Sequence, residues 1–168
     1  MTTTKPAIAV AIVLALVTNV RAAALTIAKA HDERVNNAVK QCKPQDMIDL
    51  YENDAVVIYP GEGEIGRGKA EIAKIVKNFF TGFCPDQNKK VGYKDVSFNA
   101  IALSPTYIMI IRVLDVTDKD GNLARLRTTE LIHKSGRKWR YLIDHASIGE
   151  PPTKSSHLEA PQGTPSRG

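Results

Sequence analysis

The sequence predicts an α+β domain in which helices come first and a long antiparallel β-meander follows. In residues 25–80, most of the apolar side chains recur at helical spacing. In residues 91–148, β-branched and aromatic residues fill strand-length runs separated by turn sequences. This order differs from alternating βαβ units, and the glycines of residues 61–68 lack the context of a phosphate-binding loop. The sequence therefore argues against a nucleotide-binding parallel sheet.

The first half of the domain carries the helices and one hairpin. Apolar residues at three- and four-residue spacing predict helices over residues 25–41, 45–51 and 69–80. Pro44 separates the first two helices, because proline cannot continue a helix. A β-branched run predicts a strand over residues 55–59, and the chain turns at residues 60–63 and returns at residues 64–66.

The second half predicts four strands. Their expected bounds are residues 91–103, 107–116, 123–134 and 138–148, with turns at residues 118–122 and 135–137. The strand over residues 107–116 is apolar on both faces, as expected for a central strand covered on both sides. The helices and the meander together make one domain over residues 25–149.

Both ends of the chain are predicted to lie outside this domain. Lys5 precedes an apolar run over residues 7–17 and an alanine cluster over residues 22–24, which is the layout of a signal peptide over residues 1–24. The run is shorter than the ~20 residues that span a membrane, so a permanent anchor is the weaker alternative. We therefore expect a periplasmic or secreted protein without a stable membrane anchor. Residues 150–168, rich in proline, glycine and serine, predict a disordered tail.

Charge and cysteine content restrict the partners. The 23 Lys and Arg residues exceed the 18 Asp and Glu residues by only five, and no basic run is interleaved with aromatics, so nucleic acid is not an expected partner. His and Cys residues lack metal-ligand spacing, and we expect no metal and no cofactor. Export would permit a disulfide between Cys42 and Cys84, and the alternative of two unpaired thiols stays open.

Two segments carry a family resemblance. Residues 49–60 (DLYENDAVVIYP) and 66–72 (GRGKAEI) resemble the early part of nuclear transport factor 2-like (NTF2-like) domains. Residues 136–147 (GRKWRYLIDHAS) resemble the last strand of the SnoaL-like and kinase-association-domain-like branches. The resemblance covers residues 28–149 and implies a curved antiparallel sheet wrapped around the helices to form a conical pocket, usually in a homodimer. This superfold hosts isomerases, dehydratases and non-catalytic modules, so it does not fix the function.

Strand alternation suggests which side chains face the cone. In the last strand Trp139, Tyr141, Ile143, His145 and Ser147 share one face, which we assign to the cone, with Asp144 on the other face. His145 is the candidate acid/base, because imidazole exchanges protons near neutral pH. The alternative is a structural role for His145 and Ser147 in a hydrogen-bond network at the pocket floor.

Glu130 is the second catalytic candidate. It is either a buried carboxyl with a raised pKa or a surface residue paired with a cation. Ketosteroid isomerase-like members place an Asp base before the hairpin proline, where this chain has Tyr59, and a phenol of pKa about 10 is a poor base at neutral pH. Arg67 and Arg127 either hold an anionic ligand or form surface ion pairs. The candidate ligand-binding residues are Tyr59, Arg67, Arg127, Trp139, Tyr141 and Ser147.

The sequence thus predicts an exported NTF2-like protein that binds a small, largely apolar molecule in a conical pocket. Whether it is an enzyme stays open. Catalysis would be cofactor-free isomerisation or dehydration, with His145 as acid/base, Glu130 as second proton carrier, and Tyr59 and Ser147 orienting the ligand. The alternative is a non-catalytic dimerisation or protein-interaction module.

Overall fold

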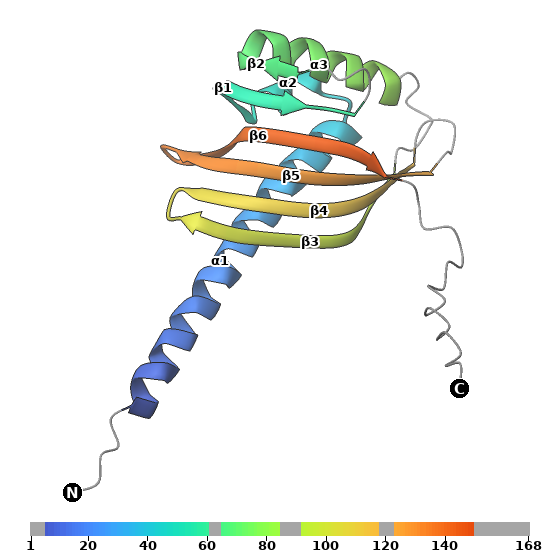
Figure 1. Ribbon diagram of the computed structural model, residues 1–168. Coiled ribbons are helices and arrows are strands. Elements are labelled where there is room, and N and C mark those ends of the chain that lie inside the picture. The colour runs from blue at the N-terminus through green and yellow to red at the C-terminus, as the bar shows by residue number, and fades with distance from the viewer. Residues whose placement is uncertain (1–5, 61–64, 85–91, 118–122, 150–168) are drawn as a thin grey trace, which may run out of the picture.

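The computed structural model describes residues 6–60, 65–84, 92–117 and 123–149. Three helices and six strands follow one another along the chain (Figure 1). They are α1 (Pro6–Lys40), α2 (Pro44–Ile48), β1 (Tyr51–Ile58), β2 (Ile65–Arg67), α3 (Gly68–Phe83), β3 (Gly92–Ser104), β4 (Tyr107–Thr117), β5 (Leu123–Ser135) and β6 (Lys138–Gly149).

The six strands form a single sheet in the order β2-β1-β6-β5-β4-β3. All neighbouring strands are antiparallel except β1 and β6, which are parallel, so the sheet is mixed rather than wholly antiparallel as predicted. α1 crosses one face of the sheet, whereas α2 and α3 lie at the end formed by β1 and β2 (Figure 1). The predicted α+β class with helices packed on one side of a curved sheet is confirmed.

Small side chains let α1 approach the sheet closely. Ala24 and Ala28 are buried in the core, and α1 packs mainly on β3. The helix ends in a Schellman turn, because the amide of Cys42 donates to the carbonyl of Val39 and the amide of Lys43 donates to that of Ala38. Cys42 takes the left-handed conformation of this turn, with φ of 52°.

Cys42 and Cys84 form a disulfide, with their Cα atoms 5.9 Å apart. The bridge joins the turn after α1 to the residue that follows α3. Of the two alternatives that the sequence left open, the structure therefore supports the disulfide.

The predicted bounds need correction at the second helix and at the first strand, which begins at Tyr51 rather than at residue 55. α2 ends at Ile48 rather than at residue 51, because Tyr51 already belongs to β1 and the carbonyl of Leu50 accepts a hydrogen bond from the amide of Tyr141 in β6. α1 continues through part of the predicted signal peptide. No helix in the described part of the chain is long and apolar enough to cross a membrane. The start of the predicted signal, the turns at 61–63 and 118–122 and the tail at 150–168 lie outside the described residues.

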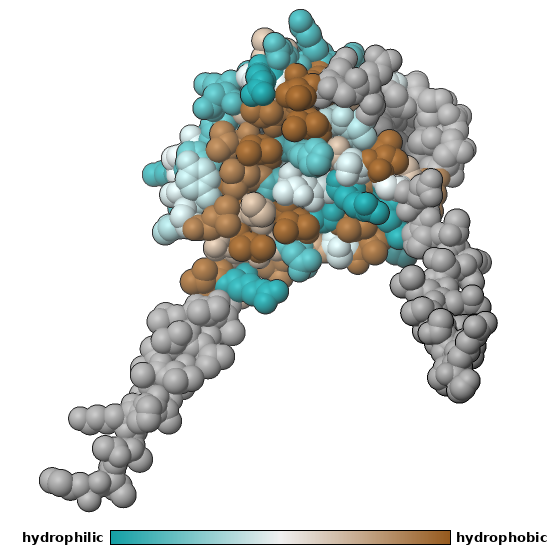
Figure 2. Space-filling model, in the orientation of Figure 1, coloured by the Kyte–Doolittle hydropathy of each residue, from teal (hydrophilic) through white to brown (hydrophobic). Residues whose placement is uncertain are grey.

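The sheet face turned away from α1 carries exposed apolar side chains. Ile101, Ile111 and Ile143 come from three different strands on this face and are 47%, 41% and 41% exposed. Figure 2 shows hydrophobic residues gathered over this side of the molecule, among polar ones. We call this surface the outer face of the sheet; the inner face is the one that packs against α1.

Candidate active site

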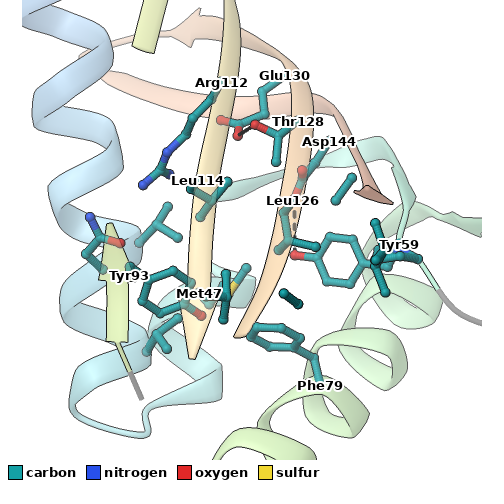
Figure 3. A pocket seen from close by; sticks show the side chains of 18 of the residues that line it. Met47, Tyr59, Phe79, Tyr93, Arg112, Leu114, Leu126, Thr128, Glu130 and Asp144 are labelled. Atoms are coloured by element: carbon teal, nitrogen blue, oxygen red, sulfur yellow. Dashed lines mark hydrogen bonds between the residues drawn. The ribbon is translucent and has the colours of Figure 1, made fainter. Parts of the chain in front are cut away.

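A cavity of about 280 Å³ lies between the inner face of the sheet and the three helices. Its walls are largely apolar and include Met47, Phe79, Leu114 and Leu126. In Figure 3 the polar side chains of Arg112, Thr128, Glu130 and Asp144 lie toward one end of the cavity, and Met47 and Phe79 lie toward the other. A cavity of this composition, with few and grouped polar groups, is typical of a small-molecule site.

Glu130 projects into the cavity from β5, and its residue is only 5% exposed. The hydroxyl of Thr128 donates to its Oε1 at 2.7 Å, and the hydroxyl of Tyr141 donates to its Oε2 at 3.1 Å. Burial, with a smaller contribution from the charge of Asp144, raises the pKa of Glu130 to about 7. Of the two alternatives for Glu130, the structure supports the buried carboxyl, which exchanges a proton near neutral pH.

Asp144 lies directly opposite Glu130 in the antiparallel pair of β5 and β6. Directly opposite residues share a sheet face and have Cβ atoms about 5 Å apart. The Tyr51 hydroxyl donates to Asp144 Oδ2 at 2.5 Å, and the Tyr59 hydroxyl lies 3.2 Å from the same oxygen and 2.9 Å from the Tyr51 hydroxyl. Burial raises the pKa of Asp144, while the tyrosine hydrogen bonds oppose that rise. The two carboxyls therefore differ in environment, and the tyrosines favour ionisation of Asp144.

A β-bulge reverses the predicted facing of the last strand. Leu131 pairs with Ile143 and Ile132 pairs with Tyr141, so Leu142 is an extra residue in β6. Beyond the bulge, Asp144 lines the cavity, and His145 takes the opposite face, paired with Thr129 and Ile58. The assignment of His145, Ile143 and Ser147 to the cone, and of Asp144 away from it, is therefore wrong.

The other predicted site residues are divided between the cavity and other surfaces. Tyr59 and Tyr141 line the cavity. Arg67 is exposed on β2, and Arg127 lies on the outer face, where its backbone carbonyl accepts from the Ser147 hydroxyl at 3.5 Å. Trp139 lines a second, apolar hollow beside the middle of α1, where Val20 and Ile27 also line it. The structure thus brings Tyr59, Tyr141 and Glu130 together and separates them from the remaining candidates.

Arg112 is a cavity residue that the sequence did not single out. Its Nη1 donates to Asp32 on α1 and its Nε donates to Asp95 on β3 at 2.6 Å. Its guanidinium also lies 5.7 Å from the centre of the Phe98 ring. The pKa of Asp32 is raised by burial and lowered by Arg112, with burial the larger cause. This ion triad links α1 to the sheet beside the cavity, with Arg112 and Asp32 buried and Asp95 partly exposed.

His31 lies behind the cavity wall. Its ring packs edge-on against Tyr141, with centroids 4.4 Å apart, and its residue is 2% exposed. Burial lowers its pKa to about 4, so it is neutral at physiological pH. Within the described residues no three His, Cys, Asp or Glu side chains are grouped as a metal site. Among the residues that the structure describes, the carboxyls that line the cavity are those of Glu130 and Asp144, and each accepts at least one hydrogen bond from a tyrosine hydroxyl.

Comparison with known proteins supports the fold. No family model matches the chain, and no curated protein matches it. Among solved structures, an NTF2-like protein of unknown function from Pseudomonas putida KT2440 has a TM-score of 0.65 and 16% identity, covering 75% of this chain and 87% of its own. A ketosteroid isomerase-like protein from Erwinia carotovora atroseptica SCRI1043 has a TM-score of 0.60 and 20% identity, covering 76% and 97%.

A scytalone dehydratase-like protein from Novosphingobium aromaticivorans DSM 12444 is also similar, with a TM-score of 0.64 and 12% identity, covering 79% of this chain and 89% of its own. Sequence identities this low show a shared fold but do not show a shared activity. The helices and the curved sheet of this chain match those of the three structures, and the chain therefore has the nuclear transport factor 2-like fold.

Proposed function

We propose that this chain is an exported protein that binds a small, largely apolar molecule in the cavity and moves a proton on it without a cofactor. The observation that carries the proposal is the pairing of Glu130 and Asp144, two buried carboxyls directly opposite one another in an apolar wall. Proton transfer near neutral pH needs one group that holds a proton and one that accepts it. Glu130, with its raised pKa, is the acid, and Asp144, held by two tyrosine hydroxyls, is the base.

The reaction class follows from these two roles. Asp144 takes a proton from the carbon beside a carbonyl group, the C–H electron pair forms the C=C bond of an enol, and Glu130 gives its proton to the carbonyl oxygen. When the substrate has a C=C bond next to that carbon, the product of the first step is a dienol. Isomerisation is then completed when Asp144 returns the proton to the far carbon of that C=C bond, the double bond moves into conjugation with the re-formed carbonyl, and the enol proton returns to Glu130. Dehydration is completed when a hydroxyl on the next carbon leaves as water with the proton from Asp144, while the enol proton returns to Glu130.

The test uses 2-tetralone, a small bicyclic ketone, as the probe. In D₂O the wild type should accelerate hydrogen–deuterium exchange at the carbon beside the carbonyl, followed by ¹H NMR. Glu130→Gln and Asp144→Asn should each slow that exchange by about 10²- to 10⁴-fold, the usual contribution of a general acid or base. Glu52→Gln is the matched control, because Glu52 contacts His133 and Arg140 away from the cavity. Equal exchange in all four proteins, folded by circular dichroism, would rule out this chemistry.

Export is supported by the apolar segment over residues 7–17 and by the Cys42–Cys84 disulfide, which persists in oxidising compartments. The test is expression of the full chain in a bacterial host, followed by fractionation and amino-terminal sequencing. A shortened chain in the periplasm or medium, with faster migration on a non-reducing gel than after reduction, is expected. A full-length chain retained in the cytoplasm would contradict export.

A second candidate function, assembly, is supported by the exposed outer face. We propose that a second copy of the chain covers Ile101, Ile111 and Ile143, because a solvent-exposed apolar sheet face is typical of an interaction surface. Light scattering after size exclusion should give twice the chain mass, and Ile111→Asp should give the monomer. Ala70→Asp, an exposed position on α3, is the control and should stay dimeric. A monomeric wild type would exclude this assembly.

A further inference from the structure

The charges around the cavity select among ligands. Of the lining residues in the described part of the chain, Arg112 is the one with a positive charge, and Glu130 and Asp144 are acidic. Arg112 is already bound to two carboxylates, Asp32 and Asp95. The guanidinium and its two partners together carry a net negative charge, so the wall that contains the arginine does not offer an anion site.

The geometry leaves Arg112 without a free two-point site for an anionic ligand. A guanidinium binds a carboxylate strongly when it presents two parallel N–H groups to it. Here Nη1 is engaged by Asp32 and Nε by Asp95, from two different elements, and the Arg112 side chain is 7% exposed. Breaking such a buried pair leaves an uncompensated charge, which is strongly unfavourable. Each two-point edge of a guanidinium uses Nε or Nη1, so a carboxylate that bound Arg112 through two parallel hydrogen bonds would have to displace Asp95 or Asp32.

The carboxyls on the opposite wall of the cavity also disfavour an anionic ligand. Glu130 and Asp144 face the cavity from neighbouring strands, directly opposite one another, and within the described residues no ion pair joins either carboxyl to a cation. A bound carboxylate or phosphate would bring a further negative charge beside Asp144, the carboxyl whose ionised form the tyrosines favour, and contact between like charges disfavours such a ligand. The aromatic rings of Tyr59, Phe79 and Tyr93 that complete the lining offer apolar faces instead.

We propose that Asp32 and Asp95 hold Arg112 out of ligand binding, so that the cavity rejects anions and takes small apolar molecules that have no acidic group. The proposal rests on the proposed function only in treating the cavity as a ligand site; it does not require catalysis. It concerns Arg112 and not Arg67 or Arg127, the two arginines that the sequence suggested for an anionic ligand, which do not line this cavity.

Three probes with the same two-ring body test the selection by titration calorimetry at neutral pH: 2-naphthol, 2-naphthoate and 2-naphthylmethylammonium. Naphthoate should bind the wild type at least about tenfold more weakly than naphthol, and the ammonium should bind more tightly than naphthoate. Equal affinity for naphthoate and naphthol would overturn the proposal. Equal weakening of both charged probes would also overturn it, because that result reflects the cost of burying any charge.

Asp95→Asn tests the role of the arginine partners directly. Asp95 has a side chain that is 43% exposed, so its replacement leaves less of the core unsatisfied than replacement of Asp32. The variant should bind naphthoate about tenfold more tightly than the wild type, with naphthol unchanged within about twofold. Asp115→Asn is the matched control: Asp115 pairs with Arg125, and neither residue lines the cavity.

The outcomes distinguish a failure of this proposal from a failure of the proposed function. If Asp95→Asn gains no more naphthoate affinity than Asp115→Asn, Arg112 is not withheld by its partners and the proposal is wrong. If Asp95→Asn does not fold, as judged by circular dichroism, the comparison of the three probes on the wild type decides. If none of the three probes binds the wild type, the cavity is not a ligand site, and the proposed function fails along with this inference.

Discussion

Replacing Glu130 by glutamine should change how the stability of the protein depends on pH. The side chain is buried, and its pKa rises from the ordinary 4.5 to about 7. The folded protein therefore keeps this proton at pH values where the unfolded chain has lost it. It follows that the free energy of unfolding falls as the pH rises from 4.5 to 7, because ionisation favours the unfolded chain.

The magnitude follows from the shift in pKa. At about 1.4 kcal/mol per pKa unit, a rise from 4.5 to about 7 corresponds to a loss of about 3 kcal/mol of stability between acid and neutral pH. Glutamine has nearly the shape of glutamic acid and does not ionise. It can still accept a hydrogen bond from the Tyr141 hydroxyl, and its amide can donate to the Thr128 hydroxyl.

Urea denaturation at a series of pH values between 4.5 and 7.5 measures the effect. The difference in unfolding free energy, Glu130→Gln minus wild type, should rise across this range by about 3 kcal/mol. If the two proteins give parallel curves, Glu130 is ionised in the folded state at neutral pH. In that case it cannot act as the acid of the proposed reaction.

Three further changes have defined outcomes. Burial lowers the pKa of His31 to about 4, so as the pH falls from 6.5 to 4 the unfolded chain takes up a proton that the folded protein does not, and the wild type loses about 3 kcal/mol of stability. His31→Leu should remove this loss. Urea denaturation at the two pH values checks this, and an unchanged pH dependence would contradict it. The double change of Cys42 and Cys84 to serine should lower the unfolding free energy by about 4 kcal/mol, since the bridge closes a chain segment with a sequence separation of 42, and denaturation with and without reductant measures it. Tyr51→Phe removes the 2.5 Å hydrogen bond to Asp144 and should raise the pKa of that carboxyl further. In the pH dependence of 2-tetralone exchange, the fall in rate on the acid side should then move to higher pH. If it does not move, Asp144 is not the base.

The order of helices and strands could be read from the sequence because each element has a clear period and turn residues separate the strands. The parallel pairing of β1 with β6 could not, since it joins segments about 90 positions apart in the chain and no local pattern encodes it. The position of Tyr59 beside Asp144 depends on that same pairing. A site assembled from such distant segments needs the tertiary structure to be known.

The prediction of which β6 side chains face the cavity was wrong for a local reason, and the sequence contains a sign of it. Trp139 and Tyr141 are apolar at odd positions, whereas Ala146 and Ile148 are apolar at even ones, and Leu142 lies between the two sets. A strict alternation extrapolated from Tyr141 therefore puts Asp144 on the wrong face, because a bulge inserts one residue and exchanges the two faces beyond it. Glu130 lies on the cavity side of β5, and the regular alternation of this strand from Ala124 to Ile132 did not by itself decide which of its two faces points inward.

The Cys42–Cys84 disulfide has a consequence for access to the cavity. Val39 of α1 and Phe79 of α3 both line the cavity, and each lies within five residues of one end of the bridge. A covalent tie between the ends of these helices prevents them from swinging apart as a hinged lid would. In the proposed function, a ligand would therefore reach the cavity without separation of these two helix ends, whose spacing the bridge fixes.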